Sequence, residues 1–265
     1  MDRNYIAGCW YASVYEQFEN NTEDVDFLLH VLESNTEGKN LKILEAACGG
    51  GRICVPLAEA GYQVTGFDAD EYMLRRCRRR MNGLTNIHVY QGDGALADWG
   101  ADYDVVIMAG NLLINIESDL NYEDAQKAFI QNASAALKPG GHLYLDFNLY
   151  SDPSRIFNTL STNSYFCGTD ESGTFGKTMS YGSVYDPVTQ ICAGSGHWEL
   201  TTANGETFIC PKPWHKYIPT LQQVCEWLDN AGLVPEKTYH NYTDAPLPEP
   251  LGPSTFRASI WAKKI

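Results

Sequence analysis

The stretch Lys42-Ile-Leu-Glu-Ala-Ala-Cys-Gly-Gly-Gly-Arg52 is the part of the sequence that decides the fold. A short apolar run ends there in three consecutive glycines, and a helix-like segment and a second apolar run at 62–67 follow it. The second run stops at Asp68, about 20 residues beyond the turn, where an acid can bind both hydroxyls of a ribose. Glycine lets backbone amides approach a ligand closely because it has no Cβ. The pattern therefore predicts a nucleoside-bearing cofactor across this turn.

The residues before the glycines distinguish between two classes of nucleoside cofactor. A dinucleotide-binding turn reads G-x-G-x-x-G and places the pyrophosphate on a helix N-terminus. Here Ala47 occupies the first glycine position, and Glu45 lies two residues before it. A carboxylate at Glu45 would repel a pyrophosphate, but it suits a cofactor that has a cationic amino acid end.

This stretch resembles motif I of the class I S-adenosylmethionine-dependent methyltransferases, usually written (D/E)-x-(G/A)-C-G-x-G. The matching residues are Glu45, Ala47, Cys48, Gly49 and Gly51. The resemblance implies S-adenosylmethionine as cofactor and S-adenosylhomocysteine as product. It also implies an α/β fold with a Rossmann-like, seven-stranded, mostly parallel sheet and a C-terminal antiparallel hairpin. A tight turn with a purely structural role is the alternative interpretation of the glycines.

The resemblance also assigns cofactor roles to residues at the carboxyl ends of successive strands. Asp68 takes the ribose hydroxyls, and Asp93, after a third strand expected at 87–91, takes the adenine amino group. A plain turn aspartate is the alternative for Asp93. Glu45 and Arg52 are expected at the amino acid end of the cofactor. The other expected cofactor-binding residues are Tyr11, Ala47, Gly49, Gly51, Ala69, Met73, Gly94, Ala109 and Gly110.

The acceptor side of the site is expected from three regions of the chain. The leader contains Trp10-Tyr-Ala-Ser-Val-Tyr-Glu16, which resembles the Tyr-(Asp)-x-x-Tyr element that lines the site in this family, although Ala12 replaces the usual Asp. The expected catalytic residues are Tyr11, Tyr15, Asn111 and His197, and the expected substrate-binding residues are Tyr15, Asn111, Asn115, Asn148, His197 and Trp214. Simple packing is the alternative role for the aromatic and imidazole groups.

Four segments differ in their sequence character. Residues 1–39 form an aromatic, helical leader that the resemblance makes a lid over the cofactor, and residues 40–149 form the cofactor-binding core. Residues 150–218 lose helical periodicity, so we expect an antiparallel β insertion that roofs the crevice and sets the substrate pocket. Residues 219–265 complete the core. Within the insertion, strand-like runs are expected at 177–185, 190–201 and 206–217.

The composition limits the class of partner. The chain has 265 residues, with 19 basic and 33 acidic side chains, so its formal net charge is −14. Binding to nucleic acid relies on basic residues that neutralise phosphates, so no nucleic-acid partner is expected. A small neutral or cationic molecule fits better. We recognise no signal peptide and no apolar run long enough to span a membrane, which predicts a cytoplasmic protein without a membrane partner. Both a monomer and a homodimer remain open.

The cysteines show no pattern of a metal site. They are Cys9, Cys48, Cys54, Cys77, Cys167, Cys192, Cys210 and Cys225. None forms a C-x-x-C pair, and none has a partner at zinc-ligand spacing. Free thiols and no metal site are therefore expected.

The reaction expected is in-line displacement of a methyl group from a sulfonium, and alignment of the two reactants can supply roughly 7 to 11 kcal/mol. An amine acceptor must first lose a proton, so burial or a nearby base has to lower its pKa. The leader and the insertion resemble small-molecule N-methyltransferases of the amino-sugar and glycine type, which predicts N-methylation of a small molecule. An O-methyltransferase with His197 or His215 as base is the alternative.

Two other classes of function remain open from the sequence. A nicotinamide-dependent oxidoreductase is disfavoured by Glu45 and by the missing third glycine of the phosphate turn. A catalytically silent partner protein would bind S-adenosylmethionine and turn nothing over.

Overall fold

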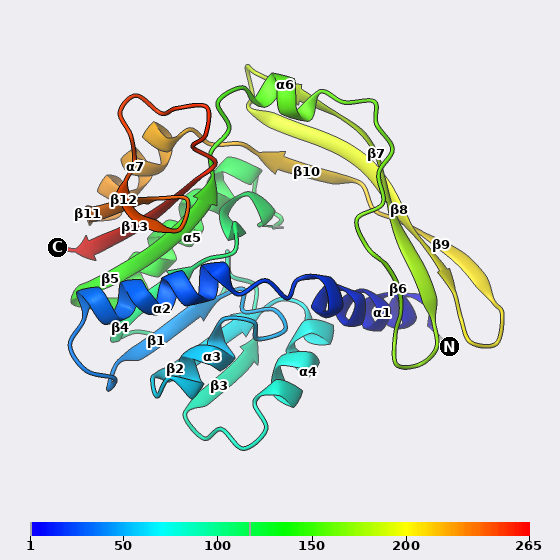
Figure 1. The fold of residues 1–265 in the computed structure, drawn as a ribbon, viewed down its shortest axis with the longest axis horizontal. Coiled ribbons are helices and arrows are strands. Elements are labelled where there is room, and N and C mark those ends of the chain that lie inside the picture. Colours follow the sequence, from blue (N-terminus) through cyan, green and yellow to red (C-terminus); the bar gives the residue numbers. More distant parts are fainter. Residues whose placement is uncertain (1, 117) are drawn as a thin grey trace. The chain divides into compact units, whose positions relative to one another are not determined.

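The computed structural model describes residues 2–116 and 118–265 and divides the chain into two compact units (Figure 1). The larger unit comprises residues 21–151 and 219–265, and the smaller unit comprises residues 2–20 and 152–218. The N-terminal segment and the insertion therefore belong to the same unit, although more than a hundred residues of the chain separate them.

An eight-stranded sheet forms the centre of the larger unit, in the order β12-β11-β13-β5-β4-β1-β2-β3. The parallel strands are β1 (Lys42–Ala46), β2 (Gln63–Asp68), β3 (Ile87–Gln91), β4 (Tyr103–Met108) and β5 (Leu137–Asn148). The antiparallel strands are β11 (Leu233–His240), β12 (Thr243–Pro246) and β13 (Arg257–Lys264). This order confirms the predicted Rossmann-like sheet with a C-terminal antiparallel hairpin, and it adds β12 as a short edge strand. The order reverses between β1 and β4, and such a switch point is where open α/β sheets bind their ligands.

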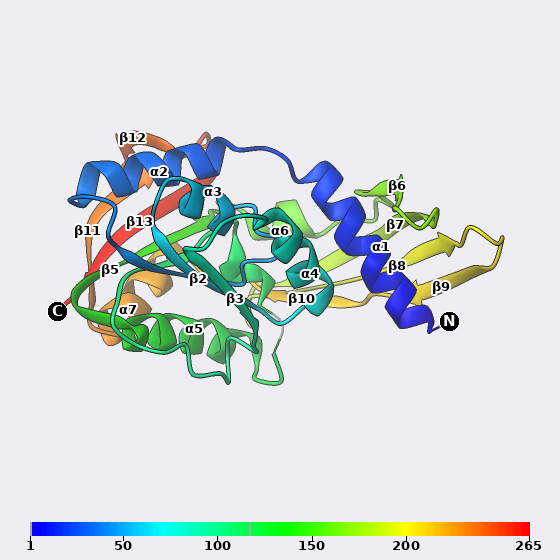
Figure 2. The same cartoon turned by 90° about the horizontal axis from the view of Figure 1, so that it is seen from below.

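Helices cover both faces of this sheet (Figure 2). One face carries α2 (Glu23–Asn35), α3 (Cys54–Glu59) and α4 (Glu71–Arg80), and the other carries α5 (Tyr122–Ala136) and α7 (Leu221–Asn230). Three of these helices begin at residues whose side chains accept from free backbone amides, namely Asp70 before α4, Asn121 before α5 and Thr220, which forms a capping box, before α7. A 3-10 turn, η1 (Leu112–Asn115), follows β4.

Alternation along β1 decides which of its side chains face the α2–α4 layer. Ile43 belongs to the apolar core beneath these helices, together with Leu28, Leu57 and Leu74. Successive strand residues point to opposite faces, so Glu45 points to the same side as Ile43. The Glu45 carboxylate therefore lies at the edge of this apolar core, near the carboxyl end of β1.

The smaller unit is an antiparallel sheet with one long helix. Its strand order is β10-β8-β7-β6, and β9 also pairs with β8. The elements are α1 (Arg3–Phe18), α6 (Pro153–Phe157), β6 (Cys167–Thr169), β7 (Phe175–Asp186), β8 (Ile191–Thr201), β9 (Thr207–Pro211) and β10 (Trp214–Tyr217). The two long strands β7 and β8 run side by side in Figure 1. The run predicted at 206–217 is two strands, because Pro211 and Pro213 lack the amide hydrogen that a continuous ladder needs.

Trp10 attaches α1 to this sheet. Its side chain is fully buried in a cluster with Val14, Leu200 and Phe208, and its Nε1–H donates to the carbonyl of Gly168 at 3.0 Å. A buried indole nitrogen that finds an acceptor avoids the cost of an unmade hydrogen bond. The aromatic leader is therefore a structural part of the insertion's sheet.

Candidate active site

The glycine turn after β1 uses backbone conformations that favour glycine. Ala47, Gly49 and Gly51 have φ values of 53°, 52° and 83°. A Cβ on Gly51 would lie 2.7 Å from the Sγ of Cys77, so only glycine fits there. The amide of Gly49 donates to the carboxylate of Asp68 at 2.8 Å, which ties the turn to the end of β2. These contacts hold backbone amides at the switch point of the sheet.

Glu45 is a buried acid with unused hydrogen-bonding capacity. Its residue is only 4% exposed, and its Oε2 has no hydrogen-bond partner. Burial raises the pKa of Glu45 to about 8; the nearby Cys77 thiol adds to the rise, while hydrogen bonding from Cys54 and the charge of Arg52 oppose it. A buried carboxylate oxygen without a partner is costly. An ammonium group at this point would satisfy the oxygen and favour its charged form, so the site fits a cofactor with a cationic amino acid end.

Arg52, predicted beside the cofactor's carboxylate, makes a bidentate ion pair with Asp24 of α2. The two guanidinium–carboxylate distances are 2.5 and 2.6 Å, and the Asp24 side chain is only 11% exposed. Arg52 also donates to the carbonyl of Asn21 at 3.1 Å. Its Nη2 lies 3.5 Å from the point that a Cβ on Gly110 would occupy. Arg52 therefore joins the glycine turn to α2 and to the end of β4, and Asp24 is a functional candidate that the sequence did not reveal.

Asp68 and Asp93 both accept hydrogen bonds from nearby amides. Asp68 accepts from the amide of Asp70 as well as from that of Gly49, both at 2.8 Å. Burial raises the pKa of Asp68, and these two amides oppose the rise. Asp93 accepts from the amide of Ala95 at 2.8 Å, which is a turn contact. The ribose and adenine roles stay predictions.

A hydrogen-bonded network fixes the end of β4. The carboxylate of the fully buried Asp146, on β5, accepts from the amides of Gly110 at 3.3 Å and Asn111 at 2.9 Å. Asn111 has a left-handed φ of 59°, and its Oδ1 accepts from the amide of Asn148 at 2.9 Å. Asn115 donates to the carbonyl of Asn111 at 2.9 Å. The structure thus brings together the three predicted asparagines, and it adds Asp146, which the sequence did not single out.

Two further residues support Asp146, Tyr242 from the turn between β11 and β12 and Arg257 from β13. The Tyr242 hydroxyl donates to Asp146 Oδ2 at 3.3 Å, and Arg257 bonds to the Tyr242 hydroxyl and, at 3.0 Å, to Asn148 Oδ1. Burial raises the pKa of Asp146, while the two backbone amides and the Arg257 charge oppose the rise. Burial and the neighbouring Asp146 raise the pKa of Tyr242, so this hydroxyl is a proton donor.

The remaining predicted cofactor-binding residues differ in their surroundings. Gly94 packs tightly, because a Cβ there would lie 2.3 Å from the ring of Phe129. Met73 is buried in the first part of α4, and Ala69 is exposed at the end of β2. Ala109 precedes Gly110 and is half-buried beside the apolar core.

In the smaller unit, the predicted aromatic residues cluster around Trp198. Tyr11 stacks on Trp198 with ring centroids 4.5 Å apart, and Tyr15 lies 5.9 Å from Tyr11 and 5.7 Å from Phe166. The Nζ of Lys212 lies 4.0 Å from the centroid of the Trp198 ring. This ring therefore already has a cation near it, which is the contact that an ammonium ligand would use.

His197 lies in the middle of a chain of hydrogen bonds across β7 and β8. Its Nδ1 is 2.9 Å from the Tyr181 hydroxyl, and its Nε2 is 3.0 Å from Glu199 Oε1. Glu199 also pairs with Lys177 at 2.9 Å, and His197 and Lys177 lower its pKa, with His197 the larger cause. A histidine bound on one side by a carboxylate and on the other by a hydroxyl is the arrangement of a general base. By contrast, Trp214 packs on its neighbouring strand, since a Cβ on Gly194 would lie 2.2 Å from its ring.

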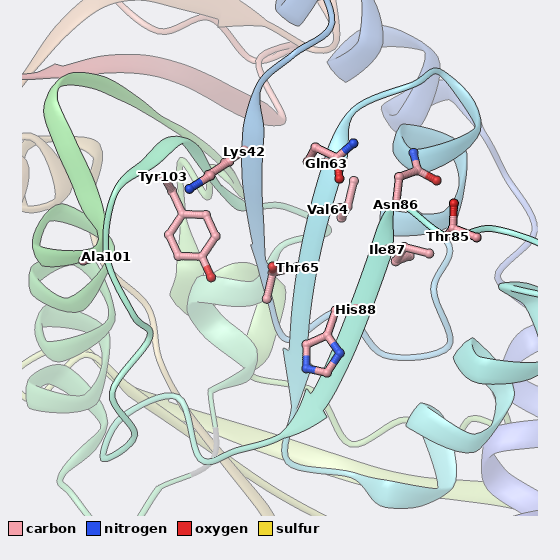
Figure 3. Close-up of a pocket in the computed structure, with 10 residues that line it drawn as sticks. All are labelled: Lys42, Gln63, Val64, Thr65, Thr85, Asn86, Ile87, His88, Ala101 and Tyr103. Atoms are coloured by element: carbon pink, nitrogen blue, oxygen red, sulfur yellow. The ribbon is translucent and has the colours of Figure 1, made fainter.

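A hollow of about 380 Å³ opens elsewhere in the larger unit (Figure 3). Lys42, Gln63 and Tyr103 lie around it at the amino ends of β1, β2 and β4, together with Asn86 and His88. Parallel sheets bind their ligands at the carboxyl ends of the strands, so this hollow is not the expected site.

Comparison with known proteins identifies the cofactor-binding part of the chain. The family model described as a methyltransferase domain matches residues 43–141, which include the glycine turn, Asp68, Asp93 and the end of β4. This segment is a class I S-adenosylmethionine-dependent methyltransferase domain. Its cofactor is S-adenosylmethionine.

Relatives of the methyltransferase domain differ in how much of the chain they cover. A putative methyltransferase of Bacillus subtilis (YqeM) is 27% identical over 245 residues, which are 88% of this chain and 89% of that protein. A ubiquinone biosynthesis O-methyltransferase of Chelativorans sp. is 30% identical over 109 residues, and the glycine N-methyltransferase of Rattus norvegicus is 27% identical over 123 residues. The match to the Chelativorans enzyme covers 40% of each chain, and the match to the rat enzyme covers 41% of each.

Solved structures share the fold over nearly the whole chain. An S-adenosylmethionine-dependent methyltransferase of Clostridium acetobutylicum superposes with a TM-score of 0.72 at 15% identity and covers 99% of both chains. The sugar N-methyltransferase KedS8 of Streptoalloteichus sp. superposes with a TM-score of 0.67 at 17% identity and covers 96% of this chain and 91% of its own. In the described part of the chain, no helix is long and apolar enough to cross a membrane.

Proposed function

We propose that the protein transfers a methyl group from S-adenosylmethionine to the nitrogen of a small-molecule amine. Bound S-adenosylmethionine supplies an electrophilic methyl group on a sulfonium. The chain's own residues bind the cofactor, orient the amine and take up the proton that the amine must lose.

The unpartnered oxygen of Glu45 is proposed to accept from the cofactor's ammonium, because no other group satisfies it. Gly49 and Gly51 allow close backbone approach, and Asp68 is the proposed contact of the ribose hydroxyls. Asp93 is the proposed adenine contact. Ala109 and Gly110 present backbone groups at the end of β4, whose conformation Asp146 holds.

The observation that carries the acceptor side of the proposal is the chain Tyr181–His197–Glu199. In the neutral tautomer that donates Nε2–H to Glu199, the free Nδ1 of His197 accepts from the Tyr181 hydroxyl. The acceptor ammonium then gives its proton to the Tyr181 oxygen as Tyr181 passes its own proton to His197. Glu199 stabilises the resulting imidazolium. The Tyr181 residue is 40% exposed, which leaves part of this side chain accessible to a ligand.

Two features favour an amine over a hydroxyl. The net charge of −14 attracts cations, and the aromatic cluster of Tyr11, Tyr15 and Trp198 already holds one cation, the Lys212 ammonium, against the Trp198 ring. The hydrogen-bonded residues Tyr181, His197 and Glu199 could equally take up the proton of a hydroxyl acceptor. An O-methyltransferase is therefore the second candidate. The named relatives include both kinds of enzyme, an O-methyltransferase and an N-methyltransferase.

The leader and the insertion are proposed to close over the cofactor and the acceptor as lid and roof. Closure would exclude water from the sulfonium and prevent hydrolysis. Tyr15, Asn111, Asn115, Asn148 and His197 are the proposed acceptor contacts.

The test is methyl transfer to matched pairs of acceptors, such as an amino sugar and the same sugar with a hydroxyl in place of the amine. We expect methylation of the amine. His197→Gln, Tyr181→Phe and Glu199→Gln should lower kcat and shift the pH profile, while S-adenosylhomocysteine still binds. His215→Gln is the matched control, since this exposed histidine on β10 is the other histidine considered as a base, and under the present proposal the variant should keep full activity.

Three results would contradict the proposal in different ways. Methylation of only the hydroxyl partner would make the protein an O-methyltransferase. Binding of S-adenosylmethionine without turnover of any acceptor would favour a silent binding protein. Binding of NAD in place of S-adenosylmethionine would favour an oxidoreductase.

A further inference from the structure

Three cysteines from three elements meet beneath the cofactor turn. Cys48 lies in the turn itself, Cys54 is the first residue of α3, and Cys77 lies in α4. All three are buried, and their Sγ atoms lie within 4.8 Å of one another. The Sγ atoms of Cys54 and Cys77 are 3.7 Å apart.

These separations suit ligands of a common metal ion. Zinc binds thiolate sulfur at about 2.3 Å with tetrahedral angles, which places two sulfur ligands roughly 3.8 Å apart. Cys54 and Cys77 already have this spacing, and the Sγ of Cys48 lies within 4.8 Å of both. A disulfide, whose sulfurs lie about 2.05 Å apart, would need a larger movement.

The surrounding backbone leaves room for the sulfurs. A Cβ on Gly51 would lie 2.7 Å from the Cys77 Sγ, and a Cβ on Gly66 would lie 2.9 Å from the Cys48 Sγ. The core is therefore shaped around this cluster.

We propose that Cys48, Cys54 and Cys77 form a three-thiolate site for a thiophilic divalent metal ion of the zinc type. Binding converts three thiols to thiolates and releases their three protons to solvent, so affinity rises with pH. The ion would join the cofactor turn to α3 and α4 and stabilise the turn before S-adenosylmethionine binds. The spacing of the cysteines in the sequence gave no sign of this site, because its ligands come from separate elements.

Cobalt(II) is the probe, since Co²⁺ bound to thiolate gives a charge-transfer absorption that Co²⁺ bound to oxygen and nitrogen lacks. The full chain, reduced and freed of metal, is titrated with Co²⁺ and then with Zn²⁺. We expect one Co²⁺ per chain, with a thiolate band that Zn²⁺ abolishes. Cys48→Ser, Cys54→Ser and Cys77→Ser should each lose the band, while Cys192→Ser, a buried thiol of β8, should keep it.

A second measurement decides the question where a variant does not fold. X-ray absorption at the zinc edge of the unaltered protein should show three sulfur neighbours. Oxygen and nitrogen neighbours only, absence of the band in the folded parent, or a band that survives in all three cluster variants would overturn the proposal. None of these results depends on methyl transfer, so the metal site and the proposed function fail separately.

Discussion

Ala47 holds a backbone conformation that glycine would adopt at lower cost. Its φ of 53° lies in the left-handed region, which costs a residue with a Cβ about 1 to 2 kcal/mol. Ala47→Gly should therefore raise the free energy of unfolding by up to about 1 kcal/mol, after the greater entropy of glycine in the unfolded chain is subtracted. Urea denaturation measures the change.

Ala46→Gly, one residue earlier in β1, is the matched control. Ala46 is buried in a regular strand, so this change should lower the stability by about 0.5 to 1 kcal/mol. An equal loss of stability in both variants would mean that Ala47 carries no strain.

The raised pKa of Glu45 predicts that the stability of the protein depends on pH. Its pKa is about 8 in the folded protein against 4.5 in the unfolded chain, so the folded state holds the proton over that range. The stabilisation from this proton is complete below pH 4.5 and is lost as the pH rises through about 8. For a fully buried group, a rise of this size corresponds to a few kcal/mol.

The measurement is the urea midpoint at several pH values, without cofactor and with a chelator present. Glu45 is flanked by Cys54, Cys77 and Arg52, and Glu45→Gln removes only its own titration. The midpoint of the parent should fall from about pH 5 to about pH 8 more steeply than that of Glu45→Gln. Parallel curves would refute a raised pKa at this position.

Among single residues, the sequence predicted those that belong to one short motif. Glu45, Gly49 and Asp68 could be singled out because they lie on a strand, a turn and a strand that are close together in the sequence. The partner of Arg52 did not follow, because Asp24 lies on a separate helix, α2, far from Arg52 in the sequence. A helical pattern shows which face is apolar, and it does not show which polar residue at the helix start meets a distant guanidinium.

At the scale of elements, the loop after β4 depends on Asp146 of β5. Asp146→Ala would leave the amides of Gly110 and Asn111 without their acceptor, at a cost of about 1 to 3 kcal/mol in stability. Because the same loop is the proposed contact of the cofactor's amino acid end, affinity for S-adenosylhomocysteine should fall by about tenfold. Isothermal titration and urea denaturation measure the two effects.

Ser259→Ala provides the control for Asp146→Ala. Ser259 lies directly opposite Asp146 on β13, is fully buried, and has a hydroxyl without a hydrogen-bond partner. Its removal should leave affinity unchanged. Equal losses in the two variants would show that general packing, and not the Asp146 carboxylate, holds the loop.

The elements that sequence predicted well are short apolar runs that end at a polar or glycine residue, such as β1 and β2. The start of β5 is harder to read from sequence, because Lys138-Pro-Gly-Gly is typical of a turn but continues as strand beside β4. The network of Asp146, Tyr242 and Arg257 was not predicted. Antiparallel pairing of β5 with β13, and the turn between β11 and β12 that carries Tyr242, bring these residues together, and no local sequence pattern predicts this.

At the scale of the molecule, burial of Trp10 explains why α1 belongs to the same unit as the insertion. The apolar side chains of Leu200 and Phe208 must be buried, and a single antiparallel sheet cannot bury its own faces. Sequence composition separated the leader from the insertion and gave no reason to join them. Only the packed structure shows that Trp10 and Gly168 are partners.

This arrangement makes the proposed lid testable by hydrogen exchange. If the leader closes over the cofactor, saturating S-adenosylhomocysteine should slow amide exchange at 47–52, 68–70 and 109–111 in the larger unit, and also in α1 around Tyr11 and Tyr15. The physical reason is that a bound ligand raises the free energy of local opening in every segment that it orders. Asp68→Ala, which removes the proposed ribose contact, should show little protection in either unit at the same ligand concentration. Protection confined to residues 21–151 would mean that the cofactor binds without the leader, and Tyr11 would then have to act on the acceptor alone or only pack against Trp198.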